Sequence, residues 1–274
     1  MNPVAVKNVP IGKEAPLALI AGPCVLETET GAMEIARTLK DITGRLGIGF
    51  VFKGSCDKAN RTSIDSYRGP GMNEGLSMLQ RIGTRLDIPV TSDVHQPADA
   101  EAAAAALDLL QIPAFLCRQT DLVVRLAETG KPLNIKKGQF LAPWDMANVV
   151  KKATSTGNSR ILLTERGTTF GYNNLVVDMR SFAIMQRTGC PVVFDATHSV
   201  QLPGGAGASS SGQREFAGIL AGSAMAAGAD ALFIETHPDP DRALCDGPNS
   251  VPLSEMEALL RRILAIRSAA RTEG

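Results

Sequence analysis

Cys24, His198 and Glu235 each lie at the end of a short apolar segment, in stretches that read IAGPC, FDATH and FIETH. A thiolate, an imidazole and a carboxylate suit a borderline divalent ion such as Zn²⁺, Fe²⁺ or Mn²⁺, and the thiol excludes a pure Mg²⁺ or Ca²⁺ cage. Asp246 follows the last of these segments and supplies a fourth ligand. A single buried cysteine or histidine is more often a core residue than a ligand. The prediction of one divalent metal ion therefore rests on the convergence of all four side chains.

A second group of residues is cationic. The stretch FKGSCDKANRTSIDSYRGPG carries basic side chains together with neutral donors: Lys53, Lys58, Arg61 and Arg68, with Asn60, Thr62 and Ser63. Lys136 and Arg166 follow two later apolar segments. Arginine forks and lysine charges bind phosphate well. A solvated basic loop explains Arg68 equally well, but Lys53 and Lys136 directly end apolar segments. Because the cations form two separated groups, we expect a pair of ligands with two anionic ends.

Other polar residues have less specific interpretations. Asp93 pairs with a cation, orients a substrate hydroxyl or caps a loop, and the residues alone do not decide among these. His95 and His237 are expected to cap loops. The stretch FLCRQTD suggests a surface for a partner, because it places apolar and basic side chains beyond the end of a segment: Phe115, Leu116 and Arg118.

The cysteines limit the class of protein. The chain has five, an odd number, and no CxxC pair. This argues against a disulfide framework and against a structural zinc knuckle. Apart from Cys24, we expect ordinary free thiols: Cys56, Cys117, Cys190 and Cys245.

Eight short apolar segments alternate with longer amphipathic ones along the chain. The predicted strands cover residues 17–22, 48–54, 88–94, 107–113, 132–138, 160–167, 191–198 and 231–237. Eight strand-helix units in a chain of 274 residues match an α/β protein of the (β/α)8 TIM barrel type better than a doubly wound open sheet, which is the alternative. Nothing in the composition marks a boundary, so we expect residues 1–274 to form a single catalytic domain. The opening residues are expected to form a short strand or hairpin that covers the barrel bottom.

The barrel explains why the polar residues stand where they do. Active sites of such barrels lie at the carboxyl ends of the strands, and the first, seventh and eighth strands are neighbours once the barrel closes. Cys24, His198 and Glu235 follow or end those three strands. Residues 202–212, LPGGAGASSSG, contain too little apolar surface to pack and are expected to form a mobile loop at the same end.

Bulk properties exclude several partners. Lys and Arg together number 28, as do Asp and Glu, so no global basic field attracts nucleic acid or anionic lipid. No apolar run approaches the ~20 residues of a membrane-spanning helix, and the first residues lack the pattern of a secretory signal. We expect a cytoplasmic protein that acts on small molecules.

At these residues the chain resembles the 3-deoxy-D-manno-octulosonate 8-phosphate synthase family. The similarity extends over essentially the whole chain, in the segments IAGPC, FKGSCDKANRTS, IPAFLCRQTD, NIKKGQFLAPWD, LTERGTTFGYNNLVVDMRS, FDATHSVQLPGG and ETHPDP. The resemblance implies a (β/α)8 homotetramer, a transferase that condenses phosphoenolpyruvate with D-arabinose 5-phosphate and water and releases phosphate. Its product feeds the inner core of bacterial lipopolysaccharide.

The resemblance also implies roles for single residues. Cys24 places the chain with the metal-requiring class, which has Cys rather than Asn after the first strand. The implied metal ligands are Cys24, His198, Glu235 and Asp246, and catalytic roles are expected for Cys24, Lys136, His198 and Asp246. Phosphoenolpyruvate is expected at Lys53, Lys58, Lys136, Gln139 and Arg166. The aldose phosphate is expected at Asn60, Arg61 and Thr62, with Asp93 as a further substrate contact and Arg118 reaching in from a neighbouring subunit. The family usually has Ser in place of Thr62, and the hydroxyl is retained.

Two other functions remain open at this point. The related 3-deoxy-D-arabino-heptulosonate 7-phosphate synthases use erythrose 4-phosphate, and their loop after the second strand typically reads KPRTS. This chain reads KANRTS, and Asn60 favours the five-carbon sugar. A barrel that binds phosphosugars without catalysis is the other alternative, although such a protein does not need a metal site beside its anion sites.

Overall fold

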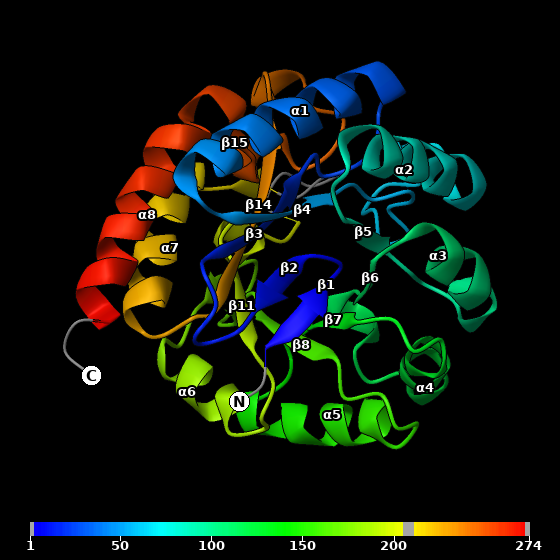
Figure 1. Cartoon of the computed structure of the whole chain (residues 1–274), viewed down its shortest axis with the longest axis vertical. Coiled ribbons are helices and arrows are strands. Elements are labelled where there is room, and N and C mark those ends of the chain that lie inside the picture. Colours follow the sequence, from blue (N-terminus) through cyan, green and yellow to red (C-terminus); the bar gives the residue numbers. More distant parts are fainter. Residues whose placement is uncertain (1–2, 205–210, 272–274) are drawn as a thin grey trace.

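The computed structural model describes residues 3–204 and 211–271, and within these ranges eight parallel strands close into a barrel (Figure 1). The barrel strands are β3 (Ala18–Gly22), β4 (Gly49–Lys53), β5 (Val90–Asp93), β6 (Leu109–Ile112), β7 (Leu133–Lys136), β8 (Ile161–Glu165), β11 (Val192–Asp195) and β14 (Ala231–His237). Each predicted strand contains one of them. Closure comes from β14, which pairs in parallel with β11 on one side and with β3 on the other. The prediction of a (β/α)8 TIM barrel is therefore confirmed, and the open sheet is excluded.

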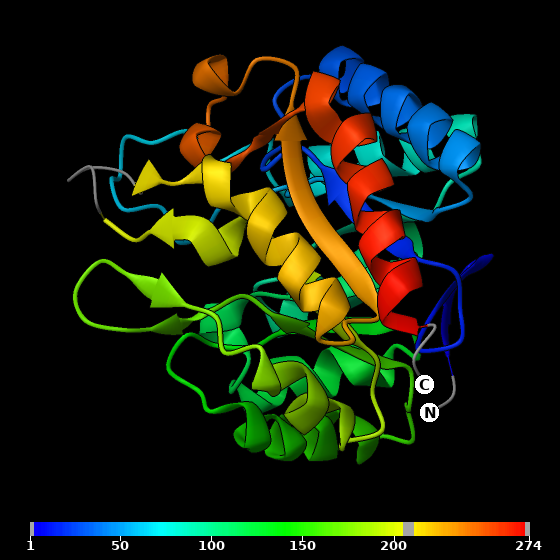
Figure 2. The ribbon, with the colours of Figure 1, turned by 90° about the vertical axis from the view of Figure 1, so that its left-hand side faces the viewer.

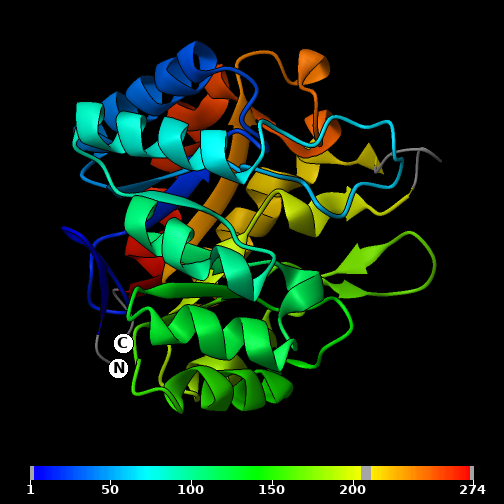
Figure 3. The same cartoon turned by 90° about the vertical axis from the view of Figure 1, so that its right-hand side faces the viewer.

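Helices follow the strands and surround the barrel (Figures 1 and 3). They are α1 (Glu29–Leu46), α2 (Met72–Leu86), α3 (Ala100–Ala106), α4 (Thr120–Glu128), α5 (Met146–Thr154), α6 (Arg180–Gln186), α7 (Ala217–Ala226) and α8 (Met256–Arg271). Helix α1 shows why these segments are helical: Thr28 accepts a hydrogen bond from Gly31 N at its start, and Gly47 adopts the left-handed conformation at its end. None of the helices in the described parts of the chain has the length and hydrophobicity to span a membrane.

Successive side chains of each strand point alternately out of and into the barrel, so the protein has an outer and an inner apolar core. In β14, Leu232 and Ile234 belong to the large apolar cluster between the strands and the helices, whereas Ala231 and Phe233 belong to the cluster inside the barrel. This two-residue period makes the next inward position of β14 that of Glu235. The barrel interior is thus apolar at the amino ends of the strands and becomes polar toward their carboxyl ends.

The N-terminal hairpin seals the apolar end. Strands β1 (Val4–Val6) and β2 (Val9–Ile11) pair antiparallel, and their valines and isoleucine join the inner cluster with Ala18, which begins β3. The expected hairpin over the barrel bottom is therefore confirmed. Burying these apolar side chains contributes roughly 1.5–3 kcal/mol for each fully buried one.

Short hairpins project from the opposite end of the barrel, as Figure 2 shows. They are β9 (Thr168–Thr169) with β10 (Leu175–Val176), and β12 (Gln201–Leu202) with β13 (Ser211–Gly212). Strand β15 (Val251–Pro252) pairs with the end of β14. Most of the Gly- and Ser-rich loop expected over 202–212 lies outside the described residues.

Candidate active site

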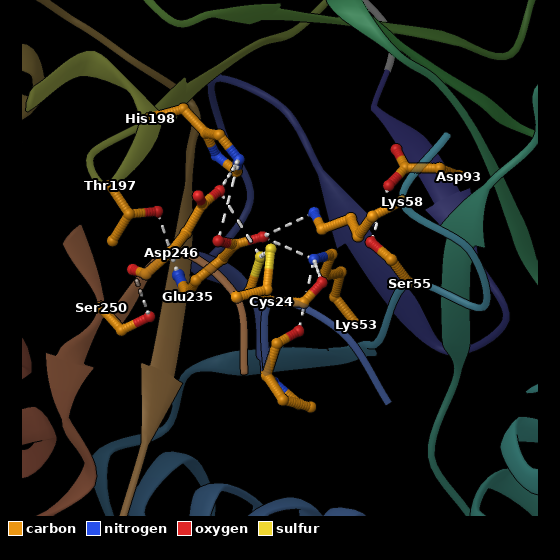
Figure 4. A network of polar contacts seen from close by, with 12 residues as sticks. Cys24, Lys53, Ser55, Lys58, Asp93, Thr197, His198, Glu235, Asp246 and Ser250 are labelled. Atoms are coloured by element: carbon orange, nitrogen blue, oxygen red, sulfur yellow. Dashed lines mark hydrogen bonds and ion pairs between the residues drawn. The ribbon is translucent and has the colours of Figure 1, made fainter. Parts of the chain in front are cut away.

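Charged side chains form the upper layer of the barrel interior. Lys53, Asp93, Lys136 and Asp195 are the last residues of β4, β5, β7 and β11, and Glu235 lies near the end of β14. All five are buried. A buried charge requires partners, because its transfer out of water is costly. The strand ends therefore bring acids and bases together within one compact network, which Figure 4 shows in part.

The four residues predicted as metal ligands lie at this end of the barrel (Figure 4). Cys24 Sγ is 3.6 Å from Asp246 Oδ2, and His198 Nε2 is 3.7 Å from Glu235 Oε2 and 3.9 Å from Asp246 Oδ2. The atoms that could hold a metal fall into two overlapping groups, one of His198, Glu235 and Asp246 and one of Cys24, Cys245 and Asp246, and within each group they lie within 4.8 Å of one another. Asp246 joins the two groups.

These distances suit a divalent ion. Ligand atoms bound at ~2.0–2.3 Å in a tetrahedron lie roughly 3.3–3.8 Å apart. Glu235 Oε2 is buried and has no hydrogen-bond partner among the described residues. An unpaired buried carboxylate oxygen that faces an imidazole nitrogen is the arrangement that a cation between them would satisfy. The residues present fit a metal ion of the predicted class.

Cys245 also belongs to this cluster, which sequence reasoning missed. Its sulfur lies 3.1 Å from Cys24 Sγ, and Arg61 Nη1 lies 2.6 Å from it. All five cysteines are free, as expected. Cys245, however, is not an ordinary core thiol, because the loop after β14 folds back and places it beside the predicted ligand. Cys245 is 221 positions from Cys24 in the chain, and no local sequence pattern predicts a contact between the two.

Lys53 contacts two of the predicted metal ligands, Glu235 and Cys24. Its Nζ donates to Glu235 Oε1 at 2.5 Å and to the carbonyl oxygen of Cys24 at 2.7 Å. Lys53 was expected to contact phosphoenolpyruvate, but its side chain is only 1% exposed and does not line either of the cavities described below. Lys53 therefore fixes the loop that carries Cys24 and the carboxylate that faces His198.

Asp195 is a second residue that sequence reasoning missed. Its Oδ2 lies 2.7 Å from Lys136 Nζ and 2.8 Å from His198 Nδ1, and its Oδ1 accepts the backbone N–H of His198 at 2.9 Å. The contact with Nδ1 leaves Nε2 of the same ring directed at Glu235 and Asp246. The ring nitrogen of a ligand histidine that does not bind metal usually contacts a carboxylate or carbonyl in this way. The signal in the sequence is the acidic residue at the inward position three residues before His198.

Neighbouring charges set the protonation of these groups. Burial alone would raise the carboxyl pKa values, but the close contacts with His198 and Lys136 outweigh it and hold the pKa of Asp195 well below its usual range. The pKa of Glu235 is lowered in the same way by His198, Lys53 and Lys58. Burial raises the pKa of the Cys24 thiol, and the contact with Cys245 raises it further. The acids are thus held as carboxylates, the form that binds a cation.

Two adjoining cavities open over the network. Lys58, Asn60, Gln139, Arg166 and His198 line both. The smaller, about 60 Å³, is also lined by polar groups at the strand ends: Asp93, His95, Lys136 and Glu235. The larger, about 160 Å³, is also lined by groups of the loops: Arg61, Thr62, Cys245 and Asp246. The structure therefore brings Lys58, Arg61, Lys136 and Arg166 to one mouth, beside the predicted metal ligands, whereas Lys53 and Arg68 line neither cavity.

Two polar atoms in this mouth are available to a ligand. Arg166 donates from Nη2 to Gln201 Oε1 at 3.1 Å, whereas its buried Nη1 has no partner among the described residues. Gln139 Oε1 is also buried and has no hydrogen-bond partner among the described residues. Burial lowers the pKa of the Arg166 guanidinium, although nearby carboxylates such as Asp195 oppose this.

Asp93 is held by a chain of hydrogen bonds across the barrel. It accepts from Ser55 Oγ and from Gln111 Nε2, each at 2.7 Å. Gln111 Oε1 in turn accepts from Asn134 Nδ2 at 2.8 Å, and Asn134 Oδ1 accepts from Thr164 Oγ1 at 2.6 Å. Asp93 also lines the smaller cavity, so a ligand bound there would lie beside it.

Arg118 and His237 lie apart from the mouth, whereas His95 is part of it. Arg118 lines a separate cavity of about 350 Å³ with Asp145 and Lys152. His237 caps its loop as expected, since its Nδ1 lies 2.7 Å from Asp239 O. His95, which was expected only to cap a loop, lines the smaller cavity.

Known proteins similar to this chain are similar over almost its whole length. A profile described as the DAHP synthetase I family matches residues 2–269. Proteins named 2-dehydro-3-deoxyphosphooctonate aldolase are 61% identical in Syntrophotalea carbinolica, over 95% of this chain and 94% of that protein, and 60% identical in Geobacter sp. strain M21, over 96% of each. The protein of that name from Desulfotalea psychrophila is 56% identical over 98% of each chain. The chain therefore belongs to the DAHP synthetase I family.

Proposed function

We propose that this chain is a 3-deoxy-D-manno-octulosonate 8-phosphate synthase, the activity to which the name of its relatives refers. It joins phosphoenolpyruvate to D-arabinose 5-phosphate, consumes water and releases inorganic phosphate. The observation that carries this proposal is the pair of adjoining cavities beside the residues that could hold a metal: the cavities share Lys58 and Arg166, and Lys136 lines only the smaller while Arg61 lines only the larger. The relatives support the five-carbon acceptor, because they share the octonate name at about 60% identity.

The two cavities suggest where each substrate lies. Phosphoenolpyruvate occupies the smaller cavity, where its charges meet Lys58, Lys136, Gln139 and Arg166. The phosphate of the aldose lies in the larger cavity near Asn60, Arg61 and Thr62. Lys53 acts on this site through Glu235 and the Cys24 loop. Asp93, which also lines the smaller cavity, orients a hydroxyl of the aldose where that sugar meets phosphoenolpyruvate.

Cys24, His198, Glu235 and Asp246 would hold one divalent ion, with Zn²⁺, Fe²⁺ and Mn²⁺ as the fitting class. When bound, such an ion supplies Lewis acidity to the aldehyde of the sugar or to the water that adds at C2. The protein's own contribution is orientation of the ligands: Asp195 holds the ring of His198, and Lys53 holds Glu235.

The cations of the mouth align the reactants and stabilise shifting charge. C3 of phosphoenolpyruvate is a weak nucleophile and must be held against the aldehyde carbon. Lys136 is fixed between Asp195 Oδ2 at 2.7 Å and the ring of Phe233, whose centroid is 3.7 Å from Nζ. A lysine held this rigidly needs little reorganisation as negative charge moves toward the leaving phosphate. Arg166 supplies a free donor to the same charge.

The assembly and setting of the enzyme follow from the same proposal. Residues 1–274 act as one catalytic domain in a cytoplasmic homotetramer, and the product enters lipopolysaccharide synthesis. Arg118 reaches a neighbouring subunit's site, which fits its place outside the mouth of its own barrel. Phe115 is exposed and also lines both cavities of the mouth. A neighbouring subunit that covers Phe115 would therefore lie at the rim of the site.

The test measures phosphate release by the purified full-length chain with phosphoenolpyruvate and one of two aldoses. We expect faster release with arabinose 5-phosphate than with erythrose 4-phosphate, loss of activity after chelation, and recovery when Zn²⁺, Fe²⁺ or Mn²⁺ is added back singly. A preference for erythrose 4-phosphate would assign the chain to the heptulosonate synthases of the same family. Binding of both substrates without phosphate release would identify a barrel that binds without catalysis.

A further inference from the structure

Two cysteine sulfurs in the mouth of the barrel are in contact. Cys24 Sγ and Cys245 Sγ are 3.1 Å apart, and both residues are buried. A disulfide bond has a sulfur-sulfur distance of about 2.03–2.05 Å, so the two atoms need to approach by only about 1 Å. Cys24 follows β3, and Cys245 lies in the loop between β14 and β15, so each is carried by a connection rather than by the middle of a strand. Connections adjust to such a shift more easily than paired strands do.

The surroundings make this pair accessible to a small oxidant. Cys245 lines the cavity of about 160 Å³, beside Arg61 and Asp246. Arg61 Nη1 lies 2.6 Å from its sulfur, which places a fixed positive charge beside it. The remaining cysteines lie elsewhere: Cys56 Sγ accepts from Ser92 Oγ at 3.3 Å, and Cys117 and Cys190 have no sulfur partner among the described residues.

We propose that Cys24 and Cys245 form a reversible disulfide when the metal site is empty, and that this bond and a bound metal ion exclude each other. Cys24 is one of the four proposed ligands, and a sulfur that is bonded to another sulfur no longer offers the thiolate that binds a metal. The exclusion rests on the metal site of the proposed function. The disulfide itself rests only on the contact between the two sulfurs.

The oxidant in this proposal is a peroxide. The sulfur of Cys245 attacks one peroxide oxygen, the O–O bond breaks, and water leaves, so that Cys245 becomes a sulfenic acid. The sulfur of Cys24 then attacks the sulfur of that acid, and the hydroxyl group leaves as a second water. Two thiols have been oxidised and one hydrogen peroxide has been reduced to two waters. A dithiol reductant reverses the bond by exchange.

The experiment counts thiols and maps the linked peptides. Full-length protein is freed of metal with a chelator and treated with hydrogen peroxide, either as it is or after loading with Zn²⁺, which has no redox chemistry of its own. Free thiols are alkylated after unfolding. Trypsin is expected to release Cys24 in peptide 14–37 and Cys245 in peptide 243–261, each with a single cysteine. We expect the metal-free protein to fall from five free thiols to three and to yield these two peptides joined, while the zinc-loaded protein keeps all five.

Two variants serve as controls. Cys245→Ala is expected to keep its four remaining thiols under peroxide, whereas Cys190→Ala is expected to lose two and still yield the linked peptides. Five thiols persisting in the oxidised metal-free protein, or a link between other cysteines, would overturn the proposal. Equal cross-linking with and without bound zinc would overturn the exclusion. A protein that forms the link but never retains zinc would refute the proposed metal site while establishing the disulfide.

Discussion

At the level of single residues, the carboxylate of Asp195 contacts both a proposed metal ligand and a proposed substrate contact. It lies 2.8 Å from His198 Nδ1 and 2.7 Å from Lys136 Nζ. We expect Asp195→Asn to lower the affinity for the metal by roughly 10–100-fold, since loss of such a partner typically has that effect. Competition for Zn²⁺ against a chromophoric chelator measures this without reference to activity.

The matched control for this change is Asp230→Asn. Asp230 is equally buried but lies at the other end of β11, where it accepts the backbone N–H of Val192 at 2.8 Å. Its substitution is expected to leave the affinity for Zn²⁺ unaltered. An Asp195→Asn protein that binds Zn²⁺ as tightly as the wild type would show that Asp195 does not position His198.

The proposed ligand Cys24 gives a more direct prediction at the same scale. Cys24→Ala removes the only sulfur among the four proposed ligands, and we expect it to abolish metal binding and most turnover. Metal content after dialysis and phosphate release measure the two effects separately. An active Cys24→Ala enzyme without metal would show that the ligand assignment is wrong.

At the level of strands, the two-residue alternation carries a polar chain through the barrel interior. Asn134 in β7 links Gln111 in β6 to Thr164 in β8. Asn134→Ala leaves both neighbours without that partner, and each unsatisfied buried group costs about 1–3 kcal/mol. We therefore expect the free energy of unfolding to fall by at least about 2 kcal/mol, measured by urea denaturation. Asn73→Ala, at an exposed position of α2, is the control and is expected to stay within about 0.5 kcal/mol of the wild type.

Strands of this kind are predictable because both of their faces are buried. Most read as largely apolar runs, six of the eight end in a charged residue or histidine, and all eight predicted segments contain a strand. The short hairpins β9–β10 and β12–β13 lie in stretches rich in Gly, Asn and Ser, which lack the apolar alternation that would have indicated strands. The local sequence pattern therefore predicts the strands of the barrel but not the short hairpins that project from its end.

The site was predictable to the extent that its residues end strands. Cys24, Lys136, His198 and Glu235 were found in this way, and they do converge. The contacts of Asp195 with Lys136 and of Cys245 with Cys24 were not found, because they span 59 and 221 positions of the chain. Such pairs depend on which strands become neighbours and on how a long loop folds back, and neither is written in the local sequence.

At the level of the whole molecule, a chain with no net charge concentrates its buried charges at one end. The carboxylates of Asp93, Asp195 and Glu235 are buried there among Lys53, Lys58 and Lys136, with His198 close by. Charges placed together in this way stabilise one another only while all of them are ionised. The stability of the fold is therefore tied to the protonation of the site.

This coupling predicts how the metal-free protein responds to acid. Burial would raise the pKa of Asp93, but Lys58, Lys53 and Lys136 lower it below the ordinary 3.8, and the pKa of Glu235 lies below the ordinary 4.5 for the same reason. A carboxyl whose pKa is lower in the folded state stabilises the fold above its unfolded pKa and loses that contribution as pH falls toward its folded pKa. Urea denaturation should give a nearly constant contribution from these groups between pH 7 and about 5 and a steep loss below about pH 4.5.

The steepness of that loss counts the protons taken up on unfolding. Each such carboxyl contributes about 1.4 kcal/mol per pH unit within its window. Asp93→Asn removes one of them and should reduce the slope below pH 4 by about that amount, while Glu34→Gln, on the exposed face of α1, should leave the slope as in the wild type. If Asp93→Asn and the wild type lose stability with the same slope, Asp93 is not held as a carboxylate by the lysines, and the charge network described for the barrel mouth is wrong at that residue.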